Sequence, residues 1–212
     1  MSIIQQISNL GQSIWYDNIS RQLLESGKLS SLVNQHGVRG LTSNPTIFCN
    51  AIKKSSDYDK SIVEHKGKSA DELFQILAIA DIQAAADILL PVYEQSNGQD
   101  GFVSIEVSPL LAANVQATID EGQKLYAAVA RKNCMIKVPG TDEGIQAVEE
   151  LLKQGIHVNV TLLFSLKSYI AVAEAYCRAL RYRVSKGLPV NSIQSVASFF
   201  VSRVDTNVDA AI

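Results

Sequence analysis

Residues 133–162, NCMIKVPGTDEGIQAVEELLKQGIHVNVTL, indicate the fold class most clearly. It begins with a short apolar run, residues 133–139, and ends with a second one, residues 157–162. Between them Thr141 is placed to begin a helix, because the apolar residues that follow it recur every three or four positions. Strand, helix and strand in this order predict a βαβ unit with two parallel strands.

The same alternation of short apolar runs and helical segments extends along the rest of the chain. We predict six strands, at residues 13–17, 38–44, 101–107, 133–139, 157–162 and 195–201. None of these runs alternates cleanly between polar and apolar residues, which indicates strands that are covered on both faces. The sequence therefore predicts a parallel α/β fold, either an open doubly wound sheet or most of an eight-stranded barrel.

The helical segments carry recognisable start signals. Ser69 with Glu72 forms the pattern of a capping box, and Ser165 is placed to cap a segment that ends near Gly187. The alanine-rich residues 113–131 favour another helix between the third and fourth strands. No internal repeat and no linker rich in Pro, Gly and Ser divides the chain, so we expect one domain over residues 1–212.

Composition excludes several classes of protein. With 47% hydrophobic and 19% charged residues, the chain has the material for a core and too little charge for a disordered chain. Nineteen Lys and Arg against 21 Asp and Glu give a net charge of −2, so we expect no binding to nucleic acid. No export signal is recognisable, and no uncharged run reaches the ~18 residues that span a bilayer. We expect a cytoplasmic protein with no membrane association.

Several reactive or basic residues are interpreted as structural. Three widely spaced cysteines predict buried, reduced thiols: Cys49, Cys134 and Cys177. Two basic groups are interpreted as solvated faces and not as anion sites: the pair Lys53 and Lys54, and the group Arg178, Arg181, Arg183 and Lys186. No histidine begins a metal-ligand spacing, so we expect no metal site. The glycine-rich loops of nucleotide-binding proteins are missing, which counts against the open sheet.

Lys137 is a candidate catalytic residue because it stands inside an apolar strand, residues 134–139. An ammonium group there must be desolvated or matched by a partner. Desolvation lowers the pKa of a lysine and leaves an amine that attacks carbonyl carbon. The alternative is a structural lysine near a strand end, whose long stem lets the charge reach water.

Two carboxylates lie at the ends of predicted strands. Asp17 closes the first strand and Glu106 lies near the end of the third. In a closed parallel barrel the carboxyl ends of the strands converge on one pocket, where an acid beside a lysine can shuttle the protons of imine formation and carbon–carbon cleavage. The alternative for each is a helix cap or a salt-bridge partner for a neighbouring loop.

Other polar residues follow the strands. Asn159 and Thr161 are two apart on one strand and therefore point to the same side, where they can bind substrate hydroxyls. Asn44 precedes Pro45, so it is either a site residue or the cap of a helix that begins with proline. Arg203 follows the last strand, where it either clamps a phosphate or pairs with Asp205.

Five segments, in order and with familiar spacing, resemble transaldolases. They are SIWYDNISR at 13–21, GVRGLTSNPTIF at 37–48, IKVPGT at 136–141, GIHVNVTLLFS at 155–165 and VASFFVSRVD at 196–205. The resemblance covers essentially the whole chain, and the stretches TSNPT and IKVP are similar to the longer bacterial type. It implies a TIM-type (β/α)8 barrel that moves a dihydroxyacetone unit between sugar phosphates in the pentose phosphate pathway. The donor would be sedoheptulose 7-phosphate or fructose 6-phosphate, with no metal or organic cofactor.

The resemblance also implies a role for each matched residue. Lys137 would form the Schiff base with the C2 carbonyl of the donor, and Asp17 would take the proton of the C4 hydroxyl as the C3–C4 bond breaks. Glu106 would assist the dehydration step through a water held with Thr161. The remaining residues would bind substrate: Asn44 and Asn159 the hydroxyls of the three-carbon enamine, and Ser198 and Arg203 the phosphate of the aldose.

The chain departs from the family pattern after the sixth predicted strand. The last two βα units of the barrel have no counterpart, so we expect residues 1–212 to form a C-terminally incomplete barrel with low activity and exposed strand edges. Association with another chain through the open edge is one expectation, and the oligomeric state stays open. Two alternative functions also remain: an aldolase that releases free dihydroxyacetone, and an inactive fragment that binds sugar phosphate or a partner chain.

Overall fold

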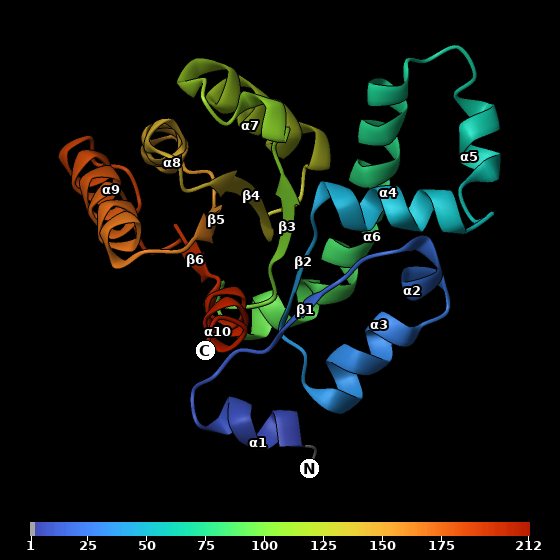
Figure 1. The fold of residues 1–212 in the computed structure, drawn as a ribbon, viewed down its shortest axis with the longest axis horizontal. Helices are drawn as coiled ribbons and strands as arrows, with labels where there is room; N and C mark the ends of the chain where they lie inside the picture. The colour runs from blue at the N-terminus through green and yellow to red at the C-terminus, as the bar shows by residue number, and fades with distance from the viewer. Residues whose placement is uncertain (1–2) are drawn as a thin grey trace. The chain divides into compact units, whose positions relative to one another are not determined.

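Each of the six predicted strands is present in the computed structural model, and a helix follows each one (Figure 1). The structure describes residues 3–212. These residues form two compact units: the first runs to Glu106 and includes Ala127–Cys134, and the second comprises Val107–Tyr126 and Met135–Ile212. The prediction of a parallel α/β fold with six βα units is confirmed.

The first unit contains three parallel strands, β1 (Trp15–Asp17), β2 (Gly40–Thr42) and β3 (Val103–Glu106). In register, Asp17 lies opposite Thr42, and Leu41 lies opposite Val103. The helices of this unit are α1 (Ile3–Asn9), α2 (Arg21–Glu25), α3 (Lys28–Ser31), the π-helix η1 (Leu32–His36), α4 (Pro45–Lys54), α5 (Asp59–Glu64) and α6 (Ala70–Gln95).

Helix α6 begins at the predicted capping box. Ser69 Oγ accepts a hydrogen bond from the backbone N–H of Glu72 at 3.3 Å, and the Glu72 carboxylate accepts one from the backbone N–H of Ser69 at 2.9 Å. By length and composition α6 is apolar enough to cross a membrane, but core helices meet the same criteria. Leu77, Ile82 and Leu89 of α6 are buried in the first unit.

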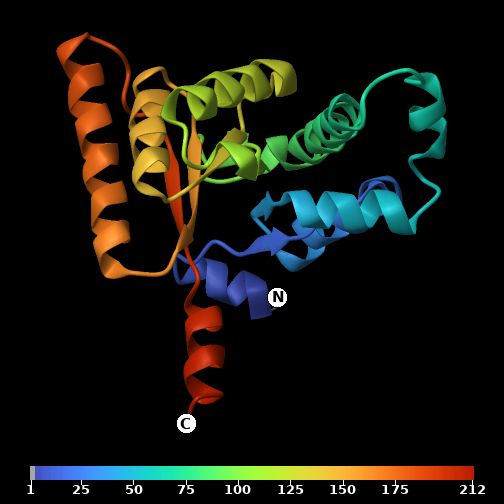
Figure 2. The ribbon, with the colours of Figure 1, turned by 45° about the horizontal axis from the view of Figure 1, so that its top comes forward.

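The second unit contains β4 (Cys134–Pro139) apart from its first residue, β5 (Val158–Leu163) and β6 (Ser195–Phe199), again parallel and in chain order. Its helices are the 3-10 helix η2 (Pro109–Leu111), most of α7 (Val115–Val129), α8 (Asp142–Lys153), α9 (Leu166–Ser185) and α10 (Val201–Asp209). Figures 1 and 2 show α8 and α9 side by side. The predicted caps Thr141 and Ser165 each accept a hydrogen bond in the first turn of their helix.

Strand β6 and helix α10 differ from the rest of the second unit. Every residue of β4 is buried, but every residue of β6 is half-exposed and α10 has no buried residue. Val201, Val204 and Val208 form an apolar stripe on α10 that is 39 to 54% exposed. Figure 2 shows α10 extending beyond the end of β6, away from α8 and α9.

Two interpretations of side-chain exposure are wrong. Cys134 is buried, and its burial raises the pKa of the thiol to about 12, but Cys49 and Cys177 lie on the exposed faces of α4 and α9. Arg183 was expected on a solvated face and is only 5% exposed. Its guanidinium donates to the carbonyl oxygens of Lys153, in the last turn of α8, and of Pro189, in the loop after α9, each at 2.9 Å.

The first turn of α8 fits closely against the end of β4, and we predict that Gly144→Ala destabilises the second unit. A Cβ atom at Gly144 would overlap the carbonyl oxygen of Pro139, a backbone atom that cannot turn aside. We expect a loss of about 1–3 kcal/mol in the free energy of unfolding, although alanine is the better helix former. Urea unfolding tests this, with Gln146→Ala on the exposed face of α8 as the control. Equal stability of the two variants would contradict the close fit.

Candidate functional site

Three candidate residues lie at the carboxyl ends of the strands in the first unit. Asp17 is the exposed last residue of β1, Glu106 is the last residue of β3, and Asn44 follows β2 by two residues. Because the three strands are parallel, their carboxyl ends lie on the same side of this sheet, at the end of the strands. Ser43 fastens the end of β2 to β3, since its buried Oγ donates to the Ser104 carbonyl oxygen at 2.9 Å.

Asn44 acts as the helix cap that one of the two interpretations predicts. Its Oδ1 accepts a hydrogen bond from the backbone N–H of Ile47 at 3.0 Å, and Pro45 occupies the first position of α4. The cap uses only the side-chain oxygen. The amide nitrogen keeps its two donors, so capping and the binding of a substrate hydroxyl are compatible.

The second unit brings four candidate residues together. Lys137 is only 6% exposed in the middle of β4 and lies opposite Asn159, while Thr161 lies opposite Pro139. Residues in register on parallel strands point to the same face, so these three polar side chains share one face of the sheet. Ser198 joins them, because its Oγ donates to Asn159 Oδ1 at 2.9 Å.

The backbone next to Thr161 is irregular. Leu162 has a φ of 61°, in the left-handed region, and the pairing of β5 with β6 shifts register between Val160 and Leu163. Positive φ in a branched residue costs free energy and is concentrated at functional sites. Bulges of this kind re-aim side chains near active sites. This irregularity could not be read from the sequence and marks the end of β5 that carries Thr161.

Arg203 lies in a different setting from the one we expected. The last strand ends at Phe199, so Arg203 falls in the first turn of α10 and is exposed. Its guanidinium lies over the ring of Phe200, 4.4 Å from the centroid. In the described part of the chain no ion pair joins it to Asp205, and no hydrogen bond joins it to Ser198 or Asn159.

A buried charge network in the first unit lies outside the predicted site residues. The carboxylate of Asp81 on α6 accepts hydrogen bonds from the Tyr58 hydroxyl at 2.7 Å and from Arg21 Nε at 3.1 Å and Nη2 at 2.9 Å. The Tyr58 hydroxyl also accepts one from the backbone N–H of Arg21 at 2.9 Å. Burial raises the pKa values of both Asp81 and Tyr58. The network fixes the start of α2, four residues after Asp17.

One signal in the sequence pointed to this network. Asp81 follows Ala80 on a helix whose neighbouring positions are apolar, and an acid in that context needs a partner. Residues 3–212 contain no cluster of three or more His, Cys, Asp or Glu that could hold a metal ion.

Comparison with known proteins identifies similar sequences. A family model described as transaldolase/fructose-6-phosphate aldolase matches residues 14–212. A transaldolase of Trichodesmium erythraeum is 49% identical over 209 residues, which are 98% of this chain and 55% of that protein. A transaldolase of Thiobacillus denitrificans is 46% identical over 214 residues, 100% of this chain and 60% of that protein. The chain therefore spans a little more than half the length of the curated relatives that it matches.

Proposed function

Because the chain belongs to the transaldolase/fructose-6-phosphate aldolase family, we propose that its protein transfers a dihydroxyacetone unit from a ketose phosphate to an aldose phosphate. The donor would be sedoheptulose 7-phosphate or fructose 6-phosphate, in the cytoplasmic pentose phosphate pathway. The observation that carries the proposal is Lys137, a buried lysine in the middle of β4 that faces Asn159. The family fold is the TIM-type barrel, and the chain holds six of its eight βα units.

The reaction begins at Lys137. Its Nζ adds to the C2 carbonyl of the donor, and loss of water leaves an iminium ion. Glu106 and Thr161 hold the water through which protons move in this dehydration. Asp17 then takes the proton of the C4 hydroxyl, the C3–C4 bond breaks, and its electrons pass into the iminium to give an enamine and a free aldose. An acceptor aldose phosphate then binds, and the same steps run in reverse: the enamine carbon bonds to the aldehyde carbon and Asp17 returns the proton. Hydrolysis of the new imine restores the lysine.

The other polar residues hold the substrate. Asn44 donates its amide N–H groups to a hydroxyl of the enamine, since its oxygen is occupied by the cap of α4. Asn159 binds a second hydroxyl, and the bond from Ser198 fixes the orientation of its amide. Arg203 binds the phosphate of the aldose, together with Ser198 once the Ser198 hydroxyl turns from Asn159 to a phosphate oxygen. These roles keep the enamine in place until an acceptor arrives.

The requirement for an acceptor tests the proposal. With fructose 6-phosphate as donor, we expect steady release of glyceraldehyde 3-phosphate only when a second aldose phosphate is supplied. Steady release of free dihydroxyacetone without an acceptor would show an aldolase instead. Saturable binding of sugar phosphate with neither product would support the inactive fragment.

We propose that further strand and helix segments pair with the exposed edge of β6. Its residues are half-exposed, the stripe on α10 is uncovered, and the relatives extend beyond the matched region. A sheet edge of this kind pairs readily with another strand. Turnover by these 212 residues alone should therefore be low.

Hydrogen exchange of the backbone amides shows whether this edge is covered. We expect the backbone amides of α10 to exchange within seconds and those of β6 to be far less protected than those of β4, because α10 buries no side chain. A βα segment that covers the edge should slow exchange in both elements. Protection of α10 equal to that of α8 in the isolated chain would contradict the open edge.

A further inference from the structure

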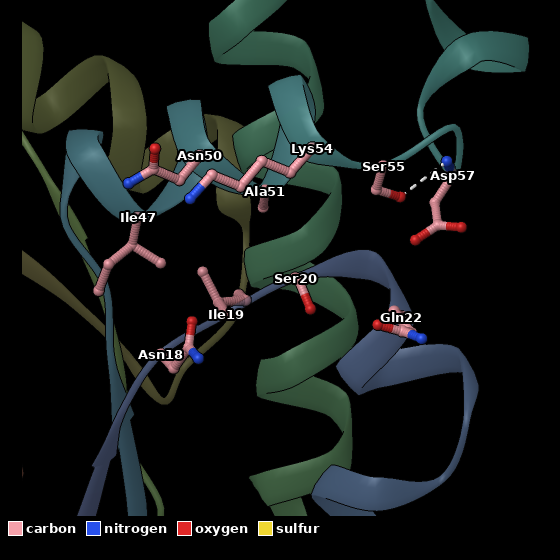
Figure 3. Close-up of a pocket in the computed structure, with 10 residues that line it drawn as sticks. All are labelled: Asn18, Ile19, Ser20, Gln22, Ile47, Asn50, Ala51, Lys54, Ser55 and Asp57. Carbon is pink, nitrogen blue, oxygen red and sulfur yellow. Dashed lines mark hydrogen bonds between the residues drawn. The ribbon is translucent and has the colours of Figure 1, made fainter.

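A hollow of about 320 Å³ opens in the first unit between the loop after β1, helix α4 and the turn before α5 (Figure 3). This volume lies at the lower end of the range for small-molecule pockets. Ile19, which is fully buried, forms an apolar wall with Ile47 and Ala51. The other lining residues are polar, so the hollow can orient a small ligand that has both kinds of surface.

Three donor groups gather toward one end of the hollow. Figure 3 shows the Lys54 side chain extending back along α4 toward the end at which Asn18 and Asn50 lie. Among residues 3–212, none of these three side chains has a hydrogen-bond or ion-pair partner. An ammonium group and two carboxamides supply the donors that bind phosphate or carboxylate oxygens.

The opposite end of the hollow offers an acceptor. Figure 3 places the Asp57 carboxylate there. The two hydroxyls of the lining each accept one hydrogen bond within the protein, Ser55 Oγ from the Asp57 backbone N–H at 2.9 Å and Ser20 Oγ from the Leu23 backbone N–H at 3.2 Å, and each keeps its O–H as a donor. A carboxylate without a counter-charge accepts hydrogen bonds from hydroxyl groups. The lining therefore suits a ligand with an anionic group at one end and hydroxyls at the other.

We propose that this hollow binds a small phosphorylated polyol, with the phosphate at Lys54, Asn18 and Asn50 and a hydroxyl at Asp57. The donor end of the hollow lies next to the carboxyl end of β1, because Asn18 directly follows Asp17. Lys54 is thus part of a binding site, whereas its neighbour Lys53 does not line the hollow and remains a solvated residue. The site depends only on the first unit and does not require the chemistry at Lys137.

Titration with glycerol 3-phosphate, followed by NMR of the side-chain amide groups, tests the proposal. We expect saturable shifts of the Asn18 and Asn50 amide signals. Lys54→Gln should weaken binding by roughly tenfold or more, because it removes a charged hydrogen-bond donor. The matched control Lys53→Gln keeps the same net charge as Lys54→Gln and should change the affinity by less than about twofold. Lys137→Met should bind as tightly as the parent, so this result stands apart from the proposed transfer reaction.

A second probe separates the two ends of the ligand. Inorganic phosphate should bind through the donor end alone, so Asp57→Asn should leave its affinity within about twofold and weaken glycerol 3-phosphate by several-fold. Three results would overturn the proposal: no saturable shift in the parent chain, equal losses from Lys53→Gln and Lys54→Gln, or shifts confined to residues outside the hollow. The backbone spectrum of each variant shows whether it has folded.

Discussion

Arg21→Met is expected to lower the free energy of unfolding by about 3–5 kcal/mol at pH 7, the largest loss that we expect from any single substitution outside the strands. Asp81 is only 2% exposed, and Arg21 supplies its sole positive charge in the described chain, through Nε and Nη2. Methionine has a similar stem but no charge, so the buried carboxylate would keep only the hydrogen bond from Tyr58. Urea unfolding at pH 7 measures the loss.

The pH dependence of that loss has a definite sign. Burial already raises the pKa of Asp81 above its ordinary value, and removal of Arg21 would raise it further. A carboxyl group whose pKa is raised by folding is protonated first in the folded state, so the unpaired charge disappears as the pH falls. The loss caused by Arg21→Met should therefore be largest at pH 7 and smaller at pH 5.

Two further variants separate the network from a general surface effect. Arg21→Met combined with Asp81→Asn should recover most of the lost stability, because no charge is left in the interior. Lys60→Met removes an exposed lysine of an i,i+4 pair on α5 and should cost at most about 0.5 kcal/mol. An Arg21→Met loss that is equal at pH 5 and pH 7 and persists in the double variant would contradict a charge-based role.

Asp17→Asn is expected to slow cleavage of the C3–C4 bond by about 10²–10⁴-fold, because asparagine cannot accept the proton of the C4 hydroxyl. Addition of Lys137 to the C2 carbonyl does not use this proton and should continue. The variant should therefore accumulate the imine of the intact donor. Reduction with borohydride after mixing with fructose 6-phosphate, followed by mass spectrometry, distinguishes a six-carbon adduct from the three-carbon adduct that remains after cleavage.

The control for Asp17→Asn is Asp59→Asn, an exposed acid in the first turn of α5 of the same unit. It should give the same mixture of adducts as the parent chain. A three-carbon adduct that forms in Asp17→Asn as quickly as in the parent would show that another base takes the proton, and would remove Asp17 from the mechanism.

The order of elements was predictable from the sequence because each depends on local signals. Short apolar runs, most of them rich in Ile, Val, Phe and Leu, located all six strands, and Ser69, Thr141 and Ser165 located the starts of three helices. The boundaries were less accurate. The predicted strand 195–201 ends at Phe199, because the chain turns into α10 two residues earlier than its apolar residues suggest.

The candidate site was predictable only in part. The two-residue spacing of Asn159 and Thr161 correctly places them on one face, because side chains alternate along a strand. The hydrogen bond between Ser198 and Asn159 joins positions 39 residues apart and follows from strand order, which local patterns do not contain. The same holds for Arg21 and Asp81, which are 60 residues apart. The prediction that Arg183 is exposed was wrong because its partners are the carbonyl groups of Lys153 in α8 and Pro189 in the loop after α9, which the local sequence does not indicate.

Covalent trapping shows whether Lys137 forms the Schiff base with the donor. The chain is mixed with fructose 6-phosphate, reduced with borohydride and digested, and the modified peptide is identified by mass spectrometry. We predict one adduct per chain, on the peptide that contains Lys137, which is lost in Lys137→Met and retained in the control Lys132→Met, a lysine exposed at an ion pair with Glu94. An adduct on a different lysine, or undiminished labelling of Lys137→Met, would contradict the account.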